Sequence, residues 1–126
     1  MNKSVTILYV DDEPMNLTVF ELNFKTKYNI VTALSGKEGL EKLENNSDII
    51  VVISDMKMPE MSGVDFIKEA RKRFKNIVYF ILTGYDISED ISEALNQNII
   101  HEYFRKPFNM REIIRAIDRA VEEYKV

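Results

Sequence analysis

Cysteine is absent from this chain of 126 residues, and histidine occurs once. Without cysteine there is no disulfide, no thiolate metal site and no cysteine nucleophile, and this composition suits a reducing compartment. No apolar run approaches the ~20 residues that a membrane-spanning helix needs, and residues 1–4 lead into a strand pattern rather than a signal peptide. We therefore expect a cytoplasmic protein with no membrane partner.

The length suits one domain, residues 1–126, that buries roughly two thirds of its unfolded surface. The chain contains no internal repeat, no low-complexity tract and no linker that would separate a second domain. Its net charge is −4, from 21 acidic and 17 basic side chains, which argues against non-specific binding to nucleic acid. We predict a single domain that does not contact nucleic acid directly.

A continuous apolar run, residues 49–53, is followed by Ser54 and Asp55. A β-branched run without alternation predicts a buried strand in the centre of a parallel sheet, with Asp55 at its carboxyl end. On this stretch alone, Asp55 as the start of a turn is equally consistent. A second strand pattern, residues 5–10, ends in the same way with Asp11 and Asp12.

The rest of the chain alternates strand and helix patterns. Strands are predicted at residues 29–33, 77–82 and 99–104, and helices at residues 14–27, 35–45, 62–75, 86–97 and from 109 onward. Ser35 and Glu38 match a capping box, in which Glu38 reaches back to the N–H of Ser35. Five strands alternating with five helices predict an α/β fold, a flavodoxin-like five-stranded parallel sheet of order 2-1-3-4-5 with helices on both faces.

Polar residues follow the predicted strands where parallel strands share one edge: Asp11, Asp12, Asp55, Thr83 and Lys106. Three neighbouring carboxylates repel one another unless a proton or a cation relieves the repulsion. Oxygen ligands without histidine or cysteine favour Mg²⁺. A carboxylate beside Mg²⁺, a lysine and a hydroxyl suit phosphoryl transfer, with Asp55 as the nucleophile.

Four motifs at these strand ends, spread over nearly the whole chain, resemble those of response-regulator receiver domains of two-component signalling. The motifs are Val10-Asp11-Asp12-Glu13-Pro14, residues 54–63 from Ser54 to Gly63, Leu82-Thr83-Gly84, and residues 103–108 from Tyr103 to Phe108. The resemblance implies a phosphorylation-controlled module of a phosphorelay. Its expected partners are a histidine kinase or histidine phosphotransfer protein, and a downstream protein or attached output domain.

By this resemblance, Asp55 accepts the phosphoryl group from a phosphohistidine of the partner. The same resemblance implies that Asp12, Asp55 and the backbone carbonyl of Lys57 hold Mg²⁺, and that Asp11 acts on it through water. Self-phosphorylation from a phosphodonor and slow autodephosphorylation are the only chemistry expected.

The resemblance also implies that Thr83 and Lys106 contact the phosphoryl oxygens and that the Lys106–Pro107 peptide bond is cis. Thr83 and Tyr103 are the expected switch residues, and they would change the face made by the fourth helix, the fifth strand and the fifth helix. Lys57 and Tyr85 depart from the commonest choices in the family. We expect these two residues to tune the lifetime of the phosphorylated state.

Two other classes of protein share some of these sequence features. A Mg²⁺-dependent aspartyl-phosphate phosphatase shares the acids, but Lys57 stands where its second acid is needed. A flavodoxin-like cofactor binder would need a phosphate-cradling loop after the first strand, and this chain has acidic residues there instead.

His101 precedes the last strand, so we expect a structural or surface role. A stripe of arginines, Arg111, Arg115 and Arg119, is either solvated or part of a partner surface.

Overall fold

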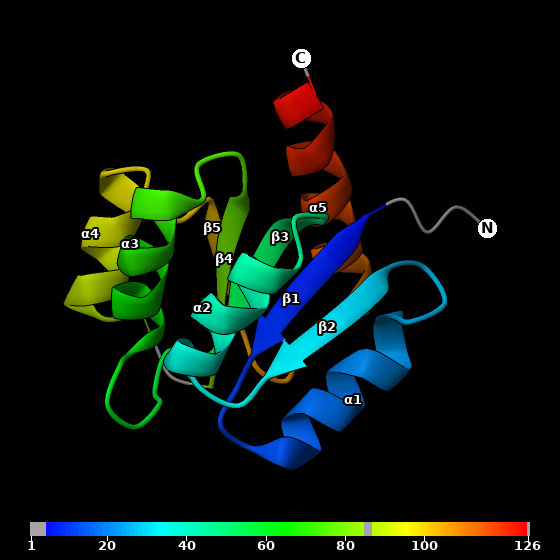
Figure 1. Ribbon diagram of the computed structural model, residues 1–126, viewed down its shortest axis with the longest axis horizontal. Helices are drawn as coiled ribbons and strands as arrows, with labels where there is room; N and C mark the ends of the chain where they lie inside the picture. Colours follow the sequence, from blue (N-terminus) through cyan, green and yellow to red (C-terminus); the bar gives the residue numbers. More distant parts are fainter. Residues whose placement is uncertain (1–4, 85–86, 126) are drawn as a thin grey trace.

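A single parallel sheet forms the centre of the computed structural model, which describes residues 5–84 and 87–125. The strand order is β2-β1-β3-β4-β5, as predicted (Figure 1). The strands are β1 (Thr6–Val10), β2 (Asn29–Ala33), β3 (Ile49–Ser54), β4 (Val78–Thr83) and β5 (Glu102–Arg105). The helices are α1 (Pro14–Phe24), α2 (Gly36–Asn45), α3 (Gly63–Arg73), α4 (Glu89–Asn96) and α5 (Met110–Lys125).

Each face of the sheet has its own apolar core. The α1–α5 core joins alternate strand residues, such as Ile7 and Ile53, to the inward stripes of α1 and α5. The α2–α3–α4 core joins the other alternate residues, such as Leu8 and Val52, to helices α2, α3 and α4. Because both faces are covered, β3 and β4 are almost continuously buried, which explains their apolar sequences.

Serine caps begin three of the helices. The side chains of Ser35, Ser62 and Ser88 each accept a hydrogen bond from the backbone N–H three residues later. The capping box predicted at α2 is confirmed for Ser35, whose side chain accepts from the N–H of Glu38. It is wrong for Glu38, whose Oε1 accepts from the N–H of Leu34, at 2.6 Å, instead of that of Ser35. The glutamate therefore secures the loop before α2 one residue earlier than predicted.

Helices α1 and α3 end two or three residues earlier than predicted. Helix α1 ends at Phe24 instead of residue 27, because Phe24 is the last buried residue of its apolar stripe and its carbonyl accepts from Lys27 and Tyr28 in a turn. Helix α3 ends at Arg73 instead of residue 75. Within the described ranges, none of the helices combines the length and the apolar character needed to cross a membrane.

Candidate functional site

The carboxyl ends of neighbouring strands are tied together by backbone hydrogen bonds. The N–H of Asp11 donates to Ala33 at the end of β2, at 3.1 Å, and the N–H of Asp55 donates to Val10 at the end of β1, at 2.8 Å. The N–H of Lys106 donates to Thr83 at the end of β4, also at 2.8 Å. These bonds extend the sheet by one residue and place the predicted site residues along one edge.

Three carboxylates gather at this edge. One oxygen each from Asp11, Asp12 and Asp55 lies within 4.8 Å of the other two. Asp11 is fully buried and Asp55 is 8 % exposed, whereas Asp12 is half-buried. Negative charges this close repel one another, and a cation bound between them would relieve the repulsion. A cluster of oxygen donors that is partly open to water fits Mg²⁺.

Lys106 places a positive charge beside the carboxylates. Its Nζ donates to Asp11 Oδ2 at 2.8 Å and lies 3.6 Å from Asp55 Oδ2. The side chain of Lys106 is 23 % exposed, so it lies between solvent and the buried acids. The Lys106–Pro107 peptide bond is cis, as expected. The Lys106 ammonium therefore forms ion pairs with both carboxylates and lies closer to that of Asp11.

Asp11 also accepts hydrogen bonds from groups that the sequence reasoning missed. The hydroxyl of Tyr9 donates to Asp11 Oδ2 at 2.7 Å, and Asn16 Nδ2 lies 3.2 and 3.3 Å from the two carboxylate oxygens. The backbone N–H of Glu13 donates to Oδ1 at 3.0 Å. Residues two apart in a strand share a face, so this alternation could have indicated Tyr9. Asn16 lies in helix α1, and strand alternation gives no signal for it.

The pKa values of the two buried acids shift in opposite directions. Burial alone would raise the pKa of Asp11, but hydrogen bonds from Lys106, the Glu13 N–H and Tyr9 outweigh it and lower the pKa. Burial raises the pKa of Asp55 to about 6, with the charge of Lys106 opposing the rise and the charge of Asp11 adding to it. Hydrogen bonds thus stabilise the ionised form of Asp11, whereas the ionised form of Asp55 receives less stabilisation from its neighbours.

The predicted switch residues lie on one face of the sheet. Thr83 is fully buried and pairs with Arg105, while Tyr103 pairs with Ile81, two residues earlier in the register. Since residues two apart in a strand point the same way, Tyr103 shares a face with Thr83. Tyr103 is half-buried and packs against the α2–α3–α4 core.

A hollow of about 580 Å³ lies between the loop after β3 and the start of α4. Exposed Lys57, Met58 and buried Thr83 contribute to its lining. The other predicted tuning residue, Tyr85, lies outside the described residues. His101 lies at the opposite edge of the sheet, before β5, where it is partly exposed and packs edge-on against Phe80, in agreement with the expected structural or surface role.

Comparison with known protein families identifies residues 7–118 as a response regulator receiver domain. A curated relative, the hydrogenase transcriptional regulatory protein HoxA of Cupriavidus necator, is 32% identical over 121 residues, which are 96% of this chain and 25% of HoxA. The response regulator SaeR of Staphylococcus aureus is 32% identical over 120 residues, which are 94% of this chain and 51% of SaeR. The chain thus spans a quarter to a half of these relatives.

Solved structures agree with the family match. A response regulator receiver domain protein from Clostridium thermocellum has a TM-score of 0.85 and 34% identity, covering 96% of this chain and 97% of that one. The response regulator TrrA from Thermotoga maritima, solved in complex with Mg²⁺ and BeF, has a TM-score of 0.78 and 31% identity, covering 91% of this chain and 97% of that one. On its sequence, its strand order and its acidic edge, this chain belongs to the response regulator receiver domain family.

Proposed function

We propose that this receiver domain takes up a phosphoryl group on Asp55. The observation that carries the proposal is the convergence of Asp55 with two further acids and one lysine at the carboxyl edge of the sheet. Asp12, Asp55 and the carbonyl of Lys57 would hold Mg²⁺, with Asp11 acting through water. When bound, Mg²⁺ offsets the negative charge of the transferring group.

The transfer uses Asp55 as the nucleophile. One of its carboxylate oxygens attacks the phosphorus of the donor, the bond between phosphorus and the donor atom breaks, and the donor leaves with the electron pair. Lys106, whose Nζ already lies 3.6 Å from Asp55, then contacts a phosphoryl oxygen, and Thr83 contacts another. The product is an acyl phosphate whose oxygens face the charges that stabilise it.

The lifetime of this acyl phosphate depends on the water that reaches it. Lys57 is exposed and lines the same hollow as Thr83, which supports a place beside the route of attacking water. Tyr85, which lies outside the described residues, is proposed for the same role from its position in the sequence. Both residues tune the rate of phosphoryl loss and leave the identity of the acceptor unchanged.

Thr83 and Tyr103 convert the local event into a change of surface. Movement of Thr83 toward the phosphoryl group frees space on the face that it shares with Tyr103, and the half-buried ring turns inward. The surface made by α4, β5 and α5 changes as a result. A histidine kinase or phosphotransfer protein supplies the phosphoryl group, and a downstream protein or attached output domain reads the changed surface.

Phosphoryl labelling of Asp55 tests this function. The wild-type chain is incubated with acetyl phosphate and Mg²⁺ and its intact mass is measured, with Asp55→Asn as the negative variant. Asp65→Asn is the matched control, because Asp65 is exposed on α3 and outside the acidic cluster. We expect one Mg²⁺-dependent phosphoryl group in the wild type and in Asp65→Asn, and none in Asp55→Asn. Equal labelling of the wild type and Asp55→Asn would exclude Asp55 as the acceptor.

A further inference from the structure

Tyr9 places a hydroxyl in the core beside the acidic cluster, where the proposed function gives it no role. The residue belongs to β1 and is only 1 % exposed. Its ring stacks on Phe20 of α1, with ring centroids 4.1 Å apart and an angle of 12° between the planes. This packing leaves the ring little freedom, so the hydroxyl is held in place against Asp11, to which it donates at 2.7 Å.

Four donor groups surround the Asp11 carboxylate. An ionised carboxylate offers about four lone-pair sites. Oδ2 accepts from the Tyr9 hydroxyl and Lys106 Nζ, Oδ1 accepts from the Glu13 N–H, and Asn16 Nδ2 lies within reach of both oxygens. Of these donors only Lys106 carries a charge. The other three are neutral and come from β1, from the loop after it and from the first turns of α1.

Phosphorylation makes competing demands on Lys106. The ammonium lies closer to Asp11 than to Asp55, at 2.8 Å against 3.6 Å, yet the proposed function requires it at the phosphoryl group on Asp55. Asp11 is fully buried, and a buried carboxylate that loses its cation is strongly destabilised unless hydrogen bonds remain. A neutral donor that stays behind lowers this cost and leaves the negative charge of Asp11 available to a cation.

We propose that Tyr9 is a positioning residue that holds the Asp11 carboxylate in place while Lys106 moves from Asp11 to the phosphoryl group. This inference rests on the proposed function and adds a residue to it. Tyr9 acts through Asp11. The stacking of its ring on Phe20 keeps its hydroxyl hydrogen-bonded to Asp11 after Lys106 has moved away.

The variant Tyr9→Phe tests the proposal, because it removes one oxygen atom and keeps the ring. Tyr28→Phe is the matched control, since Tyr28 is also buried and its hydroxyl donates to an aspartate, Asp118, at 3.0 Å. Tyr28 directly precedes β2 and so lies at the edge of the sheet opposite to the acidic cluster. The chain has no tryptophan, so Mg²⁺ binding is measured by titration calorimetry. Labelling of Asp55 by acetyl phosphate at saturating Mg²⁺ is measured separately.

In Tyr9→Phe we expect about tenfold weaker Mg²⁺ binding and about tenfold slower labelling, the lower end of the range for groups that orient metal ligands. In Tyr28→Phe both quantities should stay within about twofold of the wild type. Lys106→Gln supplies a readout that simple packing would not move. It should lower the melting temperature more in the Tyr9→Phe background than in the wild type, because Asp11 then depends on the lysine more strongly.

Equal effects of Tyr9→Phe and Tyr28→Phe would overturn the proposal, as would additive effects of Tyr9→Phe and Lys106→Gln on the melting temperature. Failure of Tyr9→Phe alone to fold would assign the hydroxyl a structural role and overturn it too. A wild-type chain that binds Mg²⁺ but is never labelled would refute the proposed function. A labelled wild type with an indistinguishable Tyr9→Phe would refute only the role of Tyr9.

Discussion

Asp11 and Asp55 lie against the same lysine, yet the pKa of one is lowered and the pKa of the other is raised. The difference arises from hydrogen bonds. Asp11 accepts from two side chains besides Lys106 and from the Glu13 N–H, whereas Asp55 accepts from the Met56 N–H at 2.8 Å. Burial is therefore compensated at Asp11 and only in part at Asp55. The proposed nucleophile is the less stabilised of the two anions.

This difference predicts a pH-dependent gain of stability in Asp55→Asn. The pKa of Asp55 is about 6 in the folded chain against an ordinary value of 3.8, so folding favours its protonated form. The protonated form of Asp55 makes its full contribution to the free energy of unfolding below about pH 4, and this contribution is lost as the pH rises through about 6. Above that pH the loss is about 3 kcal/mol, and asparagine avoids it.

Urea denaturation in the presence of a chelator measures the effect. At about pH 7.5, Asp55→Asn should be more stable than the wild type by about 2–3 kcal/mol, and the gap should narrow toward pH 4. Saturating Mg²⁺ should also narrow the gap, because the cation binds the ionised wild type more tightly than the variant. A pH-independent gap, or a less stable variant at neutral pH, would contradict this account of Asp55.

At the scale of elements, the start of α3 is packed directly against the loop that follows β3. The N–H of Gly63 donates to the Met56 carbonyl at 2.8 Å, and a Cβ at Gly63 would lie 2.2 Å from the Asp55 carbonyl oxygen. An atom there would collide with backbone, which cannot rotate away as a side chain can. This close approach holds the segment that carries Asp55 and Lys57 against the helix.

Gly63→Ala should therefore destabilise the fold by roughly 2 kcal/mol or more and weaken Mg²⁺ binding by displacing the loop. Denaturation and titration calorimetry check the two effects. Gly84→Ala is the control for stability, because no described atom lies within 4 Å of a Cβ at Gly84. Similar stability losses in both variants would contradict the packing argument.

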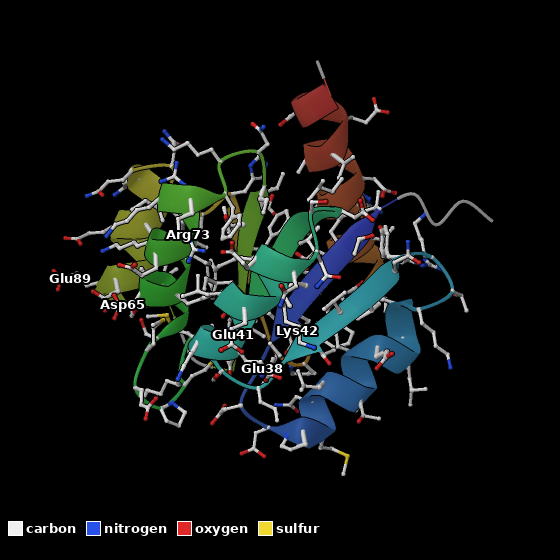
Figure 2. All side chains as sticks on the ribbon, in the orientation of Figure 1. Glu38, Glu41, Lys42, Asp65, Arg73 and Glu89 are labelled. Atoms are coloured by element: carbon white, nitrogen blue, oxygen red, sulfur yellow. The ribbon has the colours of Figure 1, made fainter. Side chains whose placement is uncertain are left out.

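Helix α1 has an apolar outer face as well as an apolar inner one. Met15, Val19 and Leu22 are spaced i, i+4, i+7 and are 71, 41 and 59 % exposed. The outer faces of α2, α3 and α4 are instead charged, as the labelled side chains in Figure 2 show: Glu38, Glu41, Lys42, Asp65, Arg73 and Glu89. The hollow beside α1, lined partly by Val19, also reaches Lys106. We expect this apolar stripe to contact the partner that delivers the phosphoryl group in the proposed function.

Leu22→Lys should then slow phosphoryl transfer from a histidine kinase at least tenfold and leave labelling by acetyl phosphate unchanged. The small donor needs no docking surface, so the two rates separate docking from chemistry. Ile87→Lys is the control, since Ile87 is 45 % exposed and lies just before α4. Equal loss with both donors would place the effect of Leu22→Lys in the fold.

At the scale of the whole molecule, the two cores divide the proposed roles. Tyr9, which donates to Asp11, belongs to the α1–α5 core, and Tyr103, the proposed switch residue, packs against the α2–α3–α4 core. A swing from 1:99 to 99:1 between inactive and active states requires phosphorylation to favour the active state by roughly 5.5 kcal/mol. Coupling of that size needs a link between Asp55 and the α4–β5–α5 face.

Thr83→Ala should break this link and leave Asp55 reactive. Hydrogen exchange in α4 and β5 is compared with and without Mg²⁺ and beryllofluoride, which occupies the phosphoryl position without transfer chemistry. We expect a clear change in the wild type, little change in Thr83→Ala, and a wild-type response in Thr83→Ser, which keeps the hydroxyl. A full response in Thr83→Ala would assign the coupling to other residues.

The sequence alone determined the order of the elements, the two covered faces and the edge that carries the site. These features follow from local patterns: buried β-branched strands such as residues 49–53, serine caps such as Ser62, and polar residues at the carboxyl ends of four strands. Parallel strands then bring their carboxyl ends to one edge, so Asp11, Asp55 and Lys106 could be grouped without coordinates.

Only the tertiary structure decided how those grouped side chains divide their contacts. It placed Lys106 nearer to Asp11 than to Asp55, gave Asp11 the hydroxyl of Tyr9, and turned Glu38 to the N–H of Leu34. Such choices depend on differences of less than an ångström and on the extent of burial. For Lys106 they arise from packing between segments that are distant in sequence. For Tyr9 and Glu38, whose partners are near in sequence, they arise from side-chain orientations that the order of residue types does not fix.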